Sequence, residues 1–520
     1  MTVIDATARG PIAGATAPAF GAKLIAAVGL VAAADYLFFE RPLGISVVVF
    51  LTLTAAAIIL TAVPRSKKAL AVKASGVLAL ALLPLVENVS GISLVLGLAA
   101  IAAFSLFATG RLRRGVSAAV RQISGSLLAV AFRFLPDLVR WRLVRRRRKT
   151  SPIFGIFAVW IVPLGLGAVF VLLFGIANPV VESWLERIEL WRLLDLLSVE
   201  RNAFWVLTFV FIWGFLRPRI SWFQRIRAPR ELIGPVRPRR EKIAVPIGRA
   251  IFGDAAILRA LIVFNAIFAV ETGLDIAYLW GGVALPEGMT YAAYAHRGAY
   301  PLILTALLAA AFVLAAVRDG GDTGRSVTIR ALIYVWTAQN VMLVISSMLR
   351  LDLYVAAYSL TYWRVAAFIW MGMVAVGLVL IILRIALGRT NDWLMSANFA
   401  ALGATLYACG FVNFAALIAN WNVDHPPEIA RVGSSLDVGY IAGLGAGALP
   451  AIDRLLVSPA GRDADWVHWL AGRREDIAAA HLSRMQDWRA WTFRNWRLMR
   501  YLHQHAATLQ SDGQMDVSGK

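Results

Sequence analysis

The stretch VAAFIWMGMVAVGLVLIILRIAL at residues 365–387 decides the fold class, because its only charged residue is Arg384. A helix needs about 20 apolar residues to cross the ~30 Å hydrocarbon core of a bilayer. Only helices and closed barrels satisfy every backbone polar group inside lipid. Comparable runs recur between Lys23 and Ala419, at residues 22–39, 44–63, 69–86, 91–109, 153–177, 202–217, 256–279, 298–317, 330–348 and 396–419. We therefore predict an all-α, polytopic transmembrane bundle of about eleven spans.

The composition agrees with a large lipid-facing surface. Hydrophobic residues make up 59% of the chain and the mean hydropathy is +0.68, which exceeds the requirement of one soluble core. The first and sixth spans are the weakest, because the first contains Asp35 and the sixth is near the lower length limit. We expect the first span to be retained rather than cleaved as a signal peptide, because the leader before Lys23 carries little positive charge.

Basic residues predict the orientation in the membrane. They follow the second, fourth, sixth, eighth and tenth spans, for example at Arg65, Arg111, Arg217, Arg318 and Arg389. Basic loops stay on the cytoplasmic side, so we expect a bacterial inner-membrane protein with a cytoplasmic N-terminus and an extracytoplasmic C-terminus. A twelfth span within residues 440–457 would instead bring the tail inside. The net charge of +21 then reflects orientation and gives no reason to expect nucleic-acid binding.

Changes in composition divide the chain into seven segments. These are a disordered N-terminus (1–21), a first four-span group (22–109), a basic amphipathic cytoplasmic segment (110–152), a two-span pair (153–217), a basic Pro-rich cytoplasmic linker (218–255), a five-span group (256–419) and an extracytoplasmic helical tail (420–520). Within the tail we expect a surface helix at 440–457 and a helix over 463–510. The latter is rich in Trp and Arg, and either lies along lipid headgroups or covers the bundle.

Membrane lipid is the first expected partner. A basic block follows the amphipathic periodicity of segment 110–152, and anionic lipid of the inner leaflet would bind it at Arg145, Arg146, Arg147, Arg148 and Lys149. The same block can equally be a plain orientation signal. A membrane-protein partner is also possible, and nucleic acid is not expected.

Ionisable side chains inside spans are costly and therefore point to function. Glu271, Asp275 and Tyr278 share one helical face in the seventh span, and Gln339 and Arg350 lie along one stripe of the ninth. His296 and Arg297 lie in the loop after the seventh span. Three interpretations compete: an ion-pair network joining the acids to Arg297 or Arg350, a ligand pocket, and a proton or ion pathway.

The sequence offers no recognisable enzyme site. Phosphate loops, nucleophile elbows and dinucleotide fingerprints do not occur in it. The histidines lack the paired spacing of a metal site, and Cys409 is the single cysteine. We therefore predict no catalytic residue, no cofactor and no metal.

One motif carries a family resemblance. Arg350, Tyr354, Tyr358, Thr361 and Arg364 fit the pattern Arg-Leu-x-x-Tyr-x-x-x-Tyr-Gly-Leu-Thr-x-x-Arg, with Ser359 in place of Gly. If the stretch is helical, it places the first four on one face with Arg364 beside them. The pattern resembles that of bacterial polytopic proteins with a domain of unknown function, the type numbered four-one-seven-three and its relative four-one-five-three. Similar stretches occur at residues 291–298, 436–452 and 487–494, so the resemblance runs from about the seventh span to the C-terminus. It implies an outer tail and supplies no activity.

These features favour a non-enzymatic inner-membrane protein, acting as an envelope sensor, scaffold or accessory subunit. The alternative is a transporter of a polar or lipid-like substrate, with Glu271, Asp275 and Arg350 lining the path. The chain has no internal repeat of the kind that marks inverted-repeat transporters.

Overall fold

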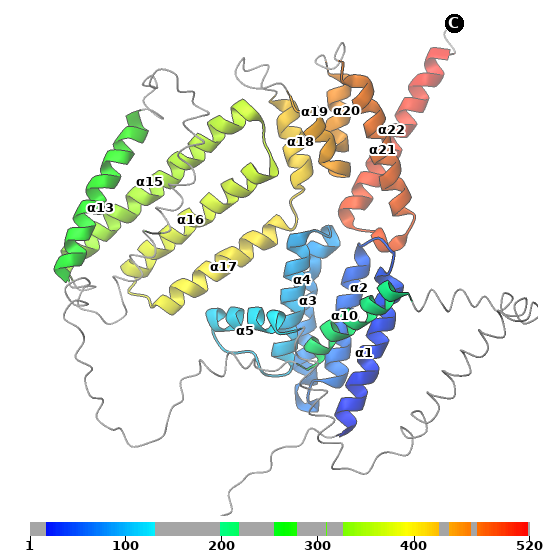
Figure 1. The fold of residues 1–520 in the computed structure, drawn as a ribbon, viewed down its shortest axis with the longest axis horizontal. Helices are drawn as coiled ribbons and strands as arrows, with labels where there is room; N and C mark the ends of the chain where they lie inside the picture. The colour runs from blue at the N-terminus through cyan, green and yellow to red at the C-terminus, as the bar shows by residue number, and fades with distance from the viewer. Residues whose placement is uncertain are drawn as a thin grey trace, which may run out of the picture. The chain divides into compact units, whose positions relative to one another are not determined.

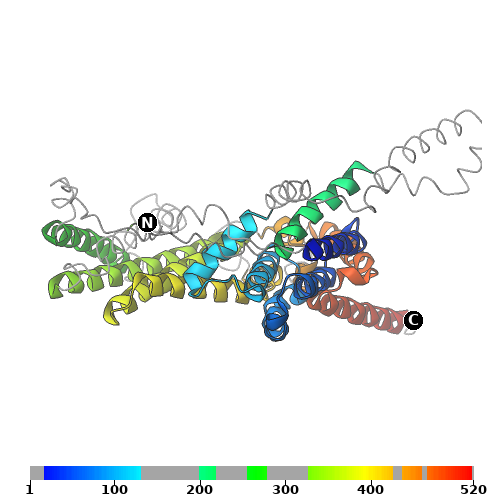
Figure 2. The ribbon, with the colours of Figure 1, turned by 90° about the horizontal axis from the view of Figure 1, so that it is seen from below.

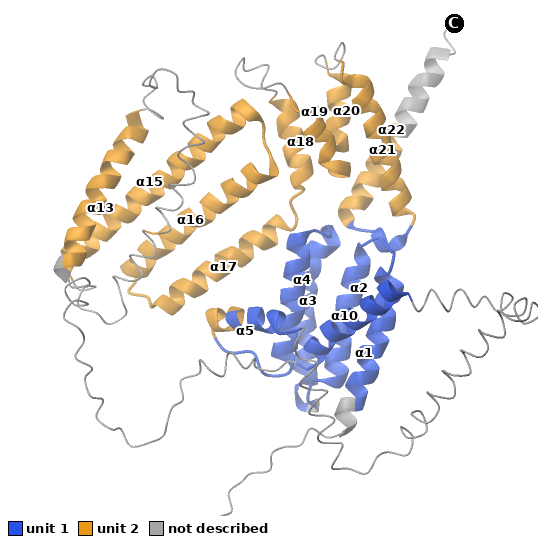
Figure 3. Cartoon of the chain, in the orientation of Figure 1, with its two compact units in different colours: residues 1–114, 121–229, 487–492 blue, residues 115–120, 230–486, 493–520 orange. Residues whose placement is uncertain are grey.

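The computed structural model describes residues 17–130, 198–217, 254–277, 308, 326–425, 436–458 and 465–517 (Figure 1). Every regular element in these ranges is a helix, which confirms the all-α prediction. The chain forms two compact units, shown in Figure 3. Unit 1 comprises residues 1–114, 121–229 and 487–492, and unit 2 comprises residues 115–120, 230–486 and 493–520.

Within the described ranges, seven helices are long and apolar enough to cross a membrane, and an eighth span results if one bent pair counts as a span. The protein is therefore a multi-pass membrane protein. The predicted count of eleven is not confirmed. Predicted span 153–177 lies outside the described residues, and only residue 308 of predicted span 298–317 is described. The helix that corresponds to 44–63 is shorter than the others.

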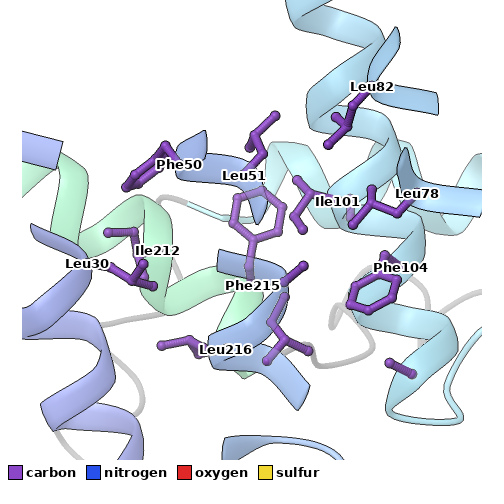
Figure 4. Packing of buried hydrophobic residues seen from close by; sticks show 14 of the residues in the cluster. Leu30, Phe50, Leu51, Leu78, Leu82, Ile101, Phe104, Ile212, Phe215 and Leu216 are labelled. Carbon is purple, nitrogen blue, oxygen red and sulfur yellow. The ribbon is translucent and has the colours of Figure 1, made fainter. Parts of the chain in front are cut away.

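The described part of unit 1 contains five apolar helices: α1 (Ala17–Phe38), α2 (Ile45–Thr61), α3 (Lys68–Glu87), α4 (Gly91–Ala108) and α10 (Val199–Leu216). Figure 2 looks nearly along the axes of the first four. Their buried side chains meet in one apolar core, to which every one of these helices contributes (Figure 4). α1 begins at Ala17, inside the segment 1–21 that was predicted to be disordered.

The amphipathic segment after α4 is described only in part. It contains α5 (Val116–Leu128), where Ile123 and Leu127 pack against the core of unit 1. Gln122 fixes the preceding loop, because its amide donates to the Arg111 carbonyl at 2.8 Å and accepts from the Arg113 N–H at 3.0 Å. The basic block at 145–149 lies outside the described residues.

A bidentate ion pair explains how the first span tolerates Asp35. Arg201 of α10 donates to both carboxylate oxygens of Asp35, at 2.8 and 2.5 Å, and the Trp205 indole donates to the same carboxylate at 2.8 Å. Bidentate, charge-assisted hydrogen bonds of this kind are the strong ones in proteins.

A segment from the C-terminal tail completes unit 1. Residues 487–492 contain the short 3₁₀ turn η6 (Trp488–Ala490), and the Ile45 N–H donates to the Trp491 carbonyl at 2.7 Å. The Arg489 guanidinium donates to the Tyr36 carbonyl at 3.0 Å and lies 4.3 Å from the centre of the Tyr36 ring. Gly44 is required here, since a Cβ on it would lie 2.4 Å from the backbone of Ala490. The predicted helix over 463–510 is accordingly broken at this docked segment.

Unit 2 contains a row of long apolar helices: α13 (Asp254–Asp275), α15 (Val327–Tyr358), α16 (Tyr362–Ala386) and α17 (Asn391–Cys409). Each packs against the next in this order (Figure 1). α15 has 32 residues and is about 48 Å long, which exceeds a ~30 Å hydrocarbon core. Its last turns pack instead against α18 (Phe414–Asp424), where Val355, Leu360 and Ile418 form a small core.

The end of the predicted eleventh span departs from a straight helix. α17 and α18 meet at a bend of 70°, which breaks the predicted span 396–419. α17 ends at Cys409, and Asn413 starts α18, because its side chain accepts from the Ala416 N–H at the N-cap.

The predicted surface helix at 440–457 is wrong. The structure has α19 (Val438–Gly443), the 3₁₀ turn η4 (Gly445–Ala448) and α20 (Leu449–Val457), with Ile441, Leu449 and Ile452 fully buried. Gly445 has a φ of +76°, which breaks the helix, and Gly447 allows close packing because a Cβ there would lie 3.0 Å from the Ala415 Cβ. Neither helix is long enough for the twelfth span considered above.

The remaining tail helices are α21 (Val467–Met485) and α22 (Phe493–Val517). A polar cluster ties them to α20. Arg474 donates to Asp453 at 2.7 Å and the Tyr501 hydroxyl donates to the same carboxylate at 2.8 Å. Burial and this hydrogen bond raise the pKa of Tyr501, so the phenol stays protonated and keeps its donor.

A candidate polar site between α13 and α15

α13 and α15 pack side by side and run in the same direction. The Asn265 amide of α13 donates to the Leu332 carbonyl of α15 at 3.1 Å, and ten residues later Asp275 pairs with Arg350. An aromatic layer lies between these polar contacts, with the Trp336 ring stacked on Phe264 at 5.2 Å and edge-on to Phe268 at 5.8 Å. The seam between the two apolar helices therefore has polar layers on both sides of an aromatic one.

Arg350 is the centre of the charged layer. Its Nη2 donates to Asp275 Oδ1 and lies 3.4 Å from Glu271 Oε1. The side chains of Arg350 and Asp275 are only 4% and 1% exposed, whereas that of Glu271 is 36% exposed. Glu271 and Asp275 are four residues apart on one face of α13, which allows both to reach one guanidinium. Among the described residues, this layer holds one basic and two acidic side chains.

Several buried oxygen atoms along the seam and beside it have no hydrogen-bond partner among the described residues. They are Asn265 Oδ1, Thr272 Oγ1, Asp275 Oδ2, Gln339 Oε1 and Asn340 Oδ1. The amide groups cannot be turned to satisfy these oxygens, because each amide nitrogen already donates to a backbone carbonyl. An unsatisfied buried polar group costs about 1–3 kcal/mol, so the helix pair retains these oxygens at a considerable cost in stability.

Tyr354, Tyr358 and Arg364 lie at the junction between α15 and α16, after the charged layer. Arg364 lies 4.6 Å from the centre of the Tyr354 ring and donates to the carbonyls of Tyr358 and Ser359. α15 ends at Tyr358, so Thr361 does not share its face as the sequence suggested; instead its hydroxyl caps α16. Ser359 has a φ of +66°, which explains why the resembling pattern has Gly at this position.

Asn422 of α18 fixes the same junction. Its side-chain amide accepts from the Leu360 N–H at 2.6 Å and donates to the Leu360 carbonyl at 3.0 Å. The Tyr440 hydroxyl accepts from the Tyr362 N–H at 3.0 Å. The motif that carried the resemblance therefore builds a helix junction, and Arg350 at its start is the member that reaches the charged layer.

The ten residues proposed from the sequence thus fall into three groups. The first lies at the seam between α13 and α15: Glu271, Asp275 and Arg350 form the charged layer, and Gln339 donates to the Asn265 carbonyl at 3.3 Å. Tyr354, Tyr358 and Arg364 form the junction. Tyr278, His296 and Arg297 lie outside the described residues.

Sequence reasoning missed Asn265, Thr272 and Asn340. Asn265 and Thr272 are seven residues apart, and Thr272 and Asp275 are three apart, which is the spacing of one helical face. A search for uncharged polar residues at this spacing within apolar runs would have found Asn265 and Thr272. Such residues are weak signals individually, because Thr and Asn also bond to their own helix backbone.

No curated protein and no solved structure matches this chain. A family model described as "Domain of unknown function (DUF4153)" matches residues 74–455, from α3 to α20. The match begins earlier than the sequence motifs suggested, and the stretch at 487–494 lies beyond it. Because the matched residues make up well over half of the chain, this protein belongs to the DUF4153 family.

Proposed function

We propose that this protein is a carrier for a small polar solute or ion in a bacterial inner membrane, with Glu271, Asp275 and Arg350 on its path. The observation that supports the proposal most is the row of unpartnered buried oxygens that accompanies the charged layer. A purely structural seam gains nothing from them, because apolar side chains of similar size would pack there without the desolvation cost.

The charge of the site supports the same proposal. Within the part of the chain that the structure describes, one arginine faces two carboxyls, and Glu271 is the more exposed of the two. An excess carboxylate in a low-dielectric environment is stabilised by a proton, a cation or a ligand donor. Glu271 is therefore our candidate for the side chain that binds the solute first. Asp275 is our candidate for the side chain that then leaves Arg350 and binds the solute.

A second candidate is the non-enzymatic sensor, scaffold or accessory subunit. The burial of the Arg350–Asp275 ion pair favours this candidate, because both side chains are almost fully buried and link α13 to α15. Under this hypothesis the pair is a structural link. The two candidates predict different results for variants of Glu271 and Asp275 that fold normally: the carrier loses its bound solute, and the structural link does not.

The experiment is mass spectrometry of the small molecules, ions, lipids and proteins that remain bound after purification in mild detergent. Wild type is compared with Glu271→Gln/Asp275→Asn and with Asp352→Asn, which removes an acid from an exposed position of α15. A solute or ion that is lost only in the double variant supports the carrier. Identical bound molecules in three equally folded proteins contradict it, and a co-purified protein without a solute supports the second candidate.

Orientation is part of the proposal. Following the distribution of basic loops, we place the N-terminus in the cytoplasm. The turn at 39–44 then lies on the extracytoplasmic side, and so does the tail segment that docks on it through Trp491 and Ile45.

A further inference from the structure

The first turns of α22 present arginines and aromatic rings to the outside of the helix. Arg497 lies 4.8 Å from the centre of the Phe493 ring, and Arg500 lies 4.9 Å from that of Trp496. The rings of Phe493 and Trp496 are themselves stacked at 5.6 Å. Phe493, Arg497 and Arg500 are exposed. We call these four residues the arginine–aromatic face.

The opposite face of α22 is held in place by the rest of the tail. Leu498 and Leu502 pack in an apolar cluster with Leu449 and Ala478, and the Tyr501 hydroxyl donates to Asp453. Because these contacts fix the rotation of the helix, the arginine–aromatic face has a fixed direction.

The charge of this segment has one sign. No acidic residue occurs between Asp487 and Asp512, whereas Arg489, Arg494, Arg497 and Arg500 fall in that stretch. A surface with basic groups and aromatic rings, and without acids, complements an anionic layer that has apolar material beneath it. Anionic phospholipid headgroups have this combination.

A contact within unit 2 places the start of α22 beside the end of an apolar helix. The Arg494 guanidinium donates to the Phe411 carbonyl at 3.2 Å, directly after the end of α17. Helix ends lie where the hydrocarbon core gives way to headgroups, and aromatic residues gather at this depth.

We propose that the arginine–aromatic face binds the headgroups of anionic phospholipids and holds the tail against the membrane surface. The guanidinium groups contact the phosphates, and Phe493 and Trp496 occupy the boundary between headgroups and acyl chains. This site lies on unit 2, apart from the seam between α13 and α15. It does not depend on the proposed carrier function.

The test is native mass spectrometry of the full-length protein in detergent, titrated with phosphatidylglycerol or with zwitterionic phosphatidylcholine. Arg497→Gln/Arg500→Gln should weaken phosphatidylglycerol binding by about thirty-fold and leave phosphatidylcholine binding unchanged. Arg497→Lys/Arg500→Lys keeps both charges and should retain most of the preference. The matched control is Arg454→Gln/Arg473→Gln, which removes two arginines whose side chains are 51% and 53% exposed elsewhere in the tail.

Melting curves establish that the variants are folded before the comparison is made. A loss of phosphatidylglycerol preference that is confined to Arg497→Gln/Arg500→Gln supports the proposal. Undiminished preference in that variant overturns it, and so does an equal loss in the control. Loss of a co-purified protein with unchanged lipid binding overturns it in favour of a protein partner.

Discussion

Arg350 and Asp275 illustrate how a membrane protein buries charge. Each is nearly inaccessible, and each provides the counter-charge that the other requires between two apolar helices. Removing one partner of a buried pair leaves a buried charge without compensation, and this costs far more than the pair contributes as a whole. The pair can thus be essential for stability without being a large source of it.

We expect Arg350→Gln to lower the free energy of unfolding by about 3–5 kcal/mol, because Asp275 loses its buried partner. Arg350→Gln/Asp275→Asn should recover part of this loss. Thermal unfolding in detergent, followed by intrinsic fluorescence, provides the measurement. Additive losses in the double variant would show that the two side chains are not coupled.

Ser359 offers a prediction of the opposite sign. Its φ of +66° and ψ of 169° belong to a region that glycine occupies almost exclusively, and a side chain there costs about 1–3 kcal/mol. Ser359→Gly should therefore raise the melting temperature. Gly388, with a φ of +61° and open space around its Cβ position, is the control, because Gly388→Ala should lower it. The same direction of change at both positions would refute the explanation.

At the scale of elements, the apolar runs were predictable and their interruptions were not. Residues 365–387 form α16 nearly as expected, because hydrophobicity over about 20 residues determines the span without help from neighbours. The bend between α17 and α18 and the break at 486–492 depend on contacts with distant residues. The hydrogen bond between Asn422 and Leu360 and the close approach of the Ala490 backbone to Gly44 are contacts of this kind. Neither contact produces a periodic pattern in the sequence.

α21 packs on α22 through a histidine that titrates abnormally. Burial lowers the pKa of His481 below its ordinary value of 6.5, with Arg484 acting in the same direction, while its Nε2 donates to the Asn495 carbonyl at 3.3 Å. Below pH 6.5 the unfolded chain binds a proton that folded His481 does not bind. The stability of the α21–α22 pair should therefore fall as the pH decreases from 7 towards 5.

Melting curves of wild type and His481→Gln between pH 5 and 7 test this prediction. The variant should depend less on pH over that interval. Parallel curves would assign the pH dependence to other groups.

For the whole molecule, the docking of residues 487–492 on the turn between α1 and α2 determines which parts of the chain share a side of the membrane. The argument holds for either absolute orientation, because it rests on contacts within unit 1. The distribution of basic loops predicts the absolute side, and adding or removing one span inverts that prediction for every later loop. A contact between chain segments does not depend on the count.

We expect Arg41→Cys and Trp488→Cys, each in a Cys409→Ala background, to react with a membrane-impermeant maleimide from the same side. Both positions are exposed. Lys67→Cys, at the other end of α2, should react from the opposite side. Labelling of Arg41→Cys and Trp488→Cys from opposite sides would contradict the docked arrangement.

The candidate site was predictable to the extent that charge identifies it. Glu271, Asp275 and Arg350 stand out because charged residues are rare in spans. Asn265 and Thr272 did not, because uncharged polar residues occur in many membrane helices without a functional role. Which helices face each other is a property of tertiary packing, so the parallel alignment of α13 and α15 could not be obtained from the periodicity of either.

The contact between Arg489 and Tyr36 also affects how the protein is made. These residues are 453 positions apart. At synthesis rates of about 5–20 residues per second, Arg489 is therefore made roughly 20 to 90 s after Tyr36. During that time Gly44 and the Tyr36 carbonyl lack the contacts that they have in the finished fold. A chain whose synthesis stops before residue 487 lacks these contacts, so the turn between α1 and α2 stays uncovered in every truncated product.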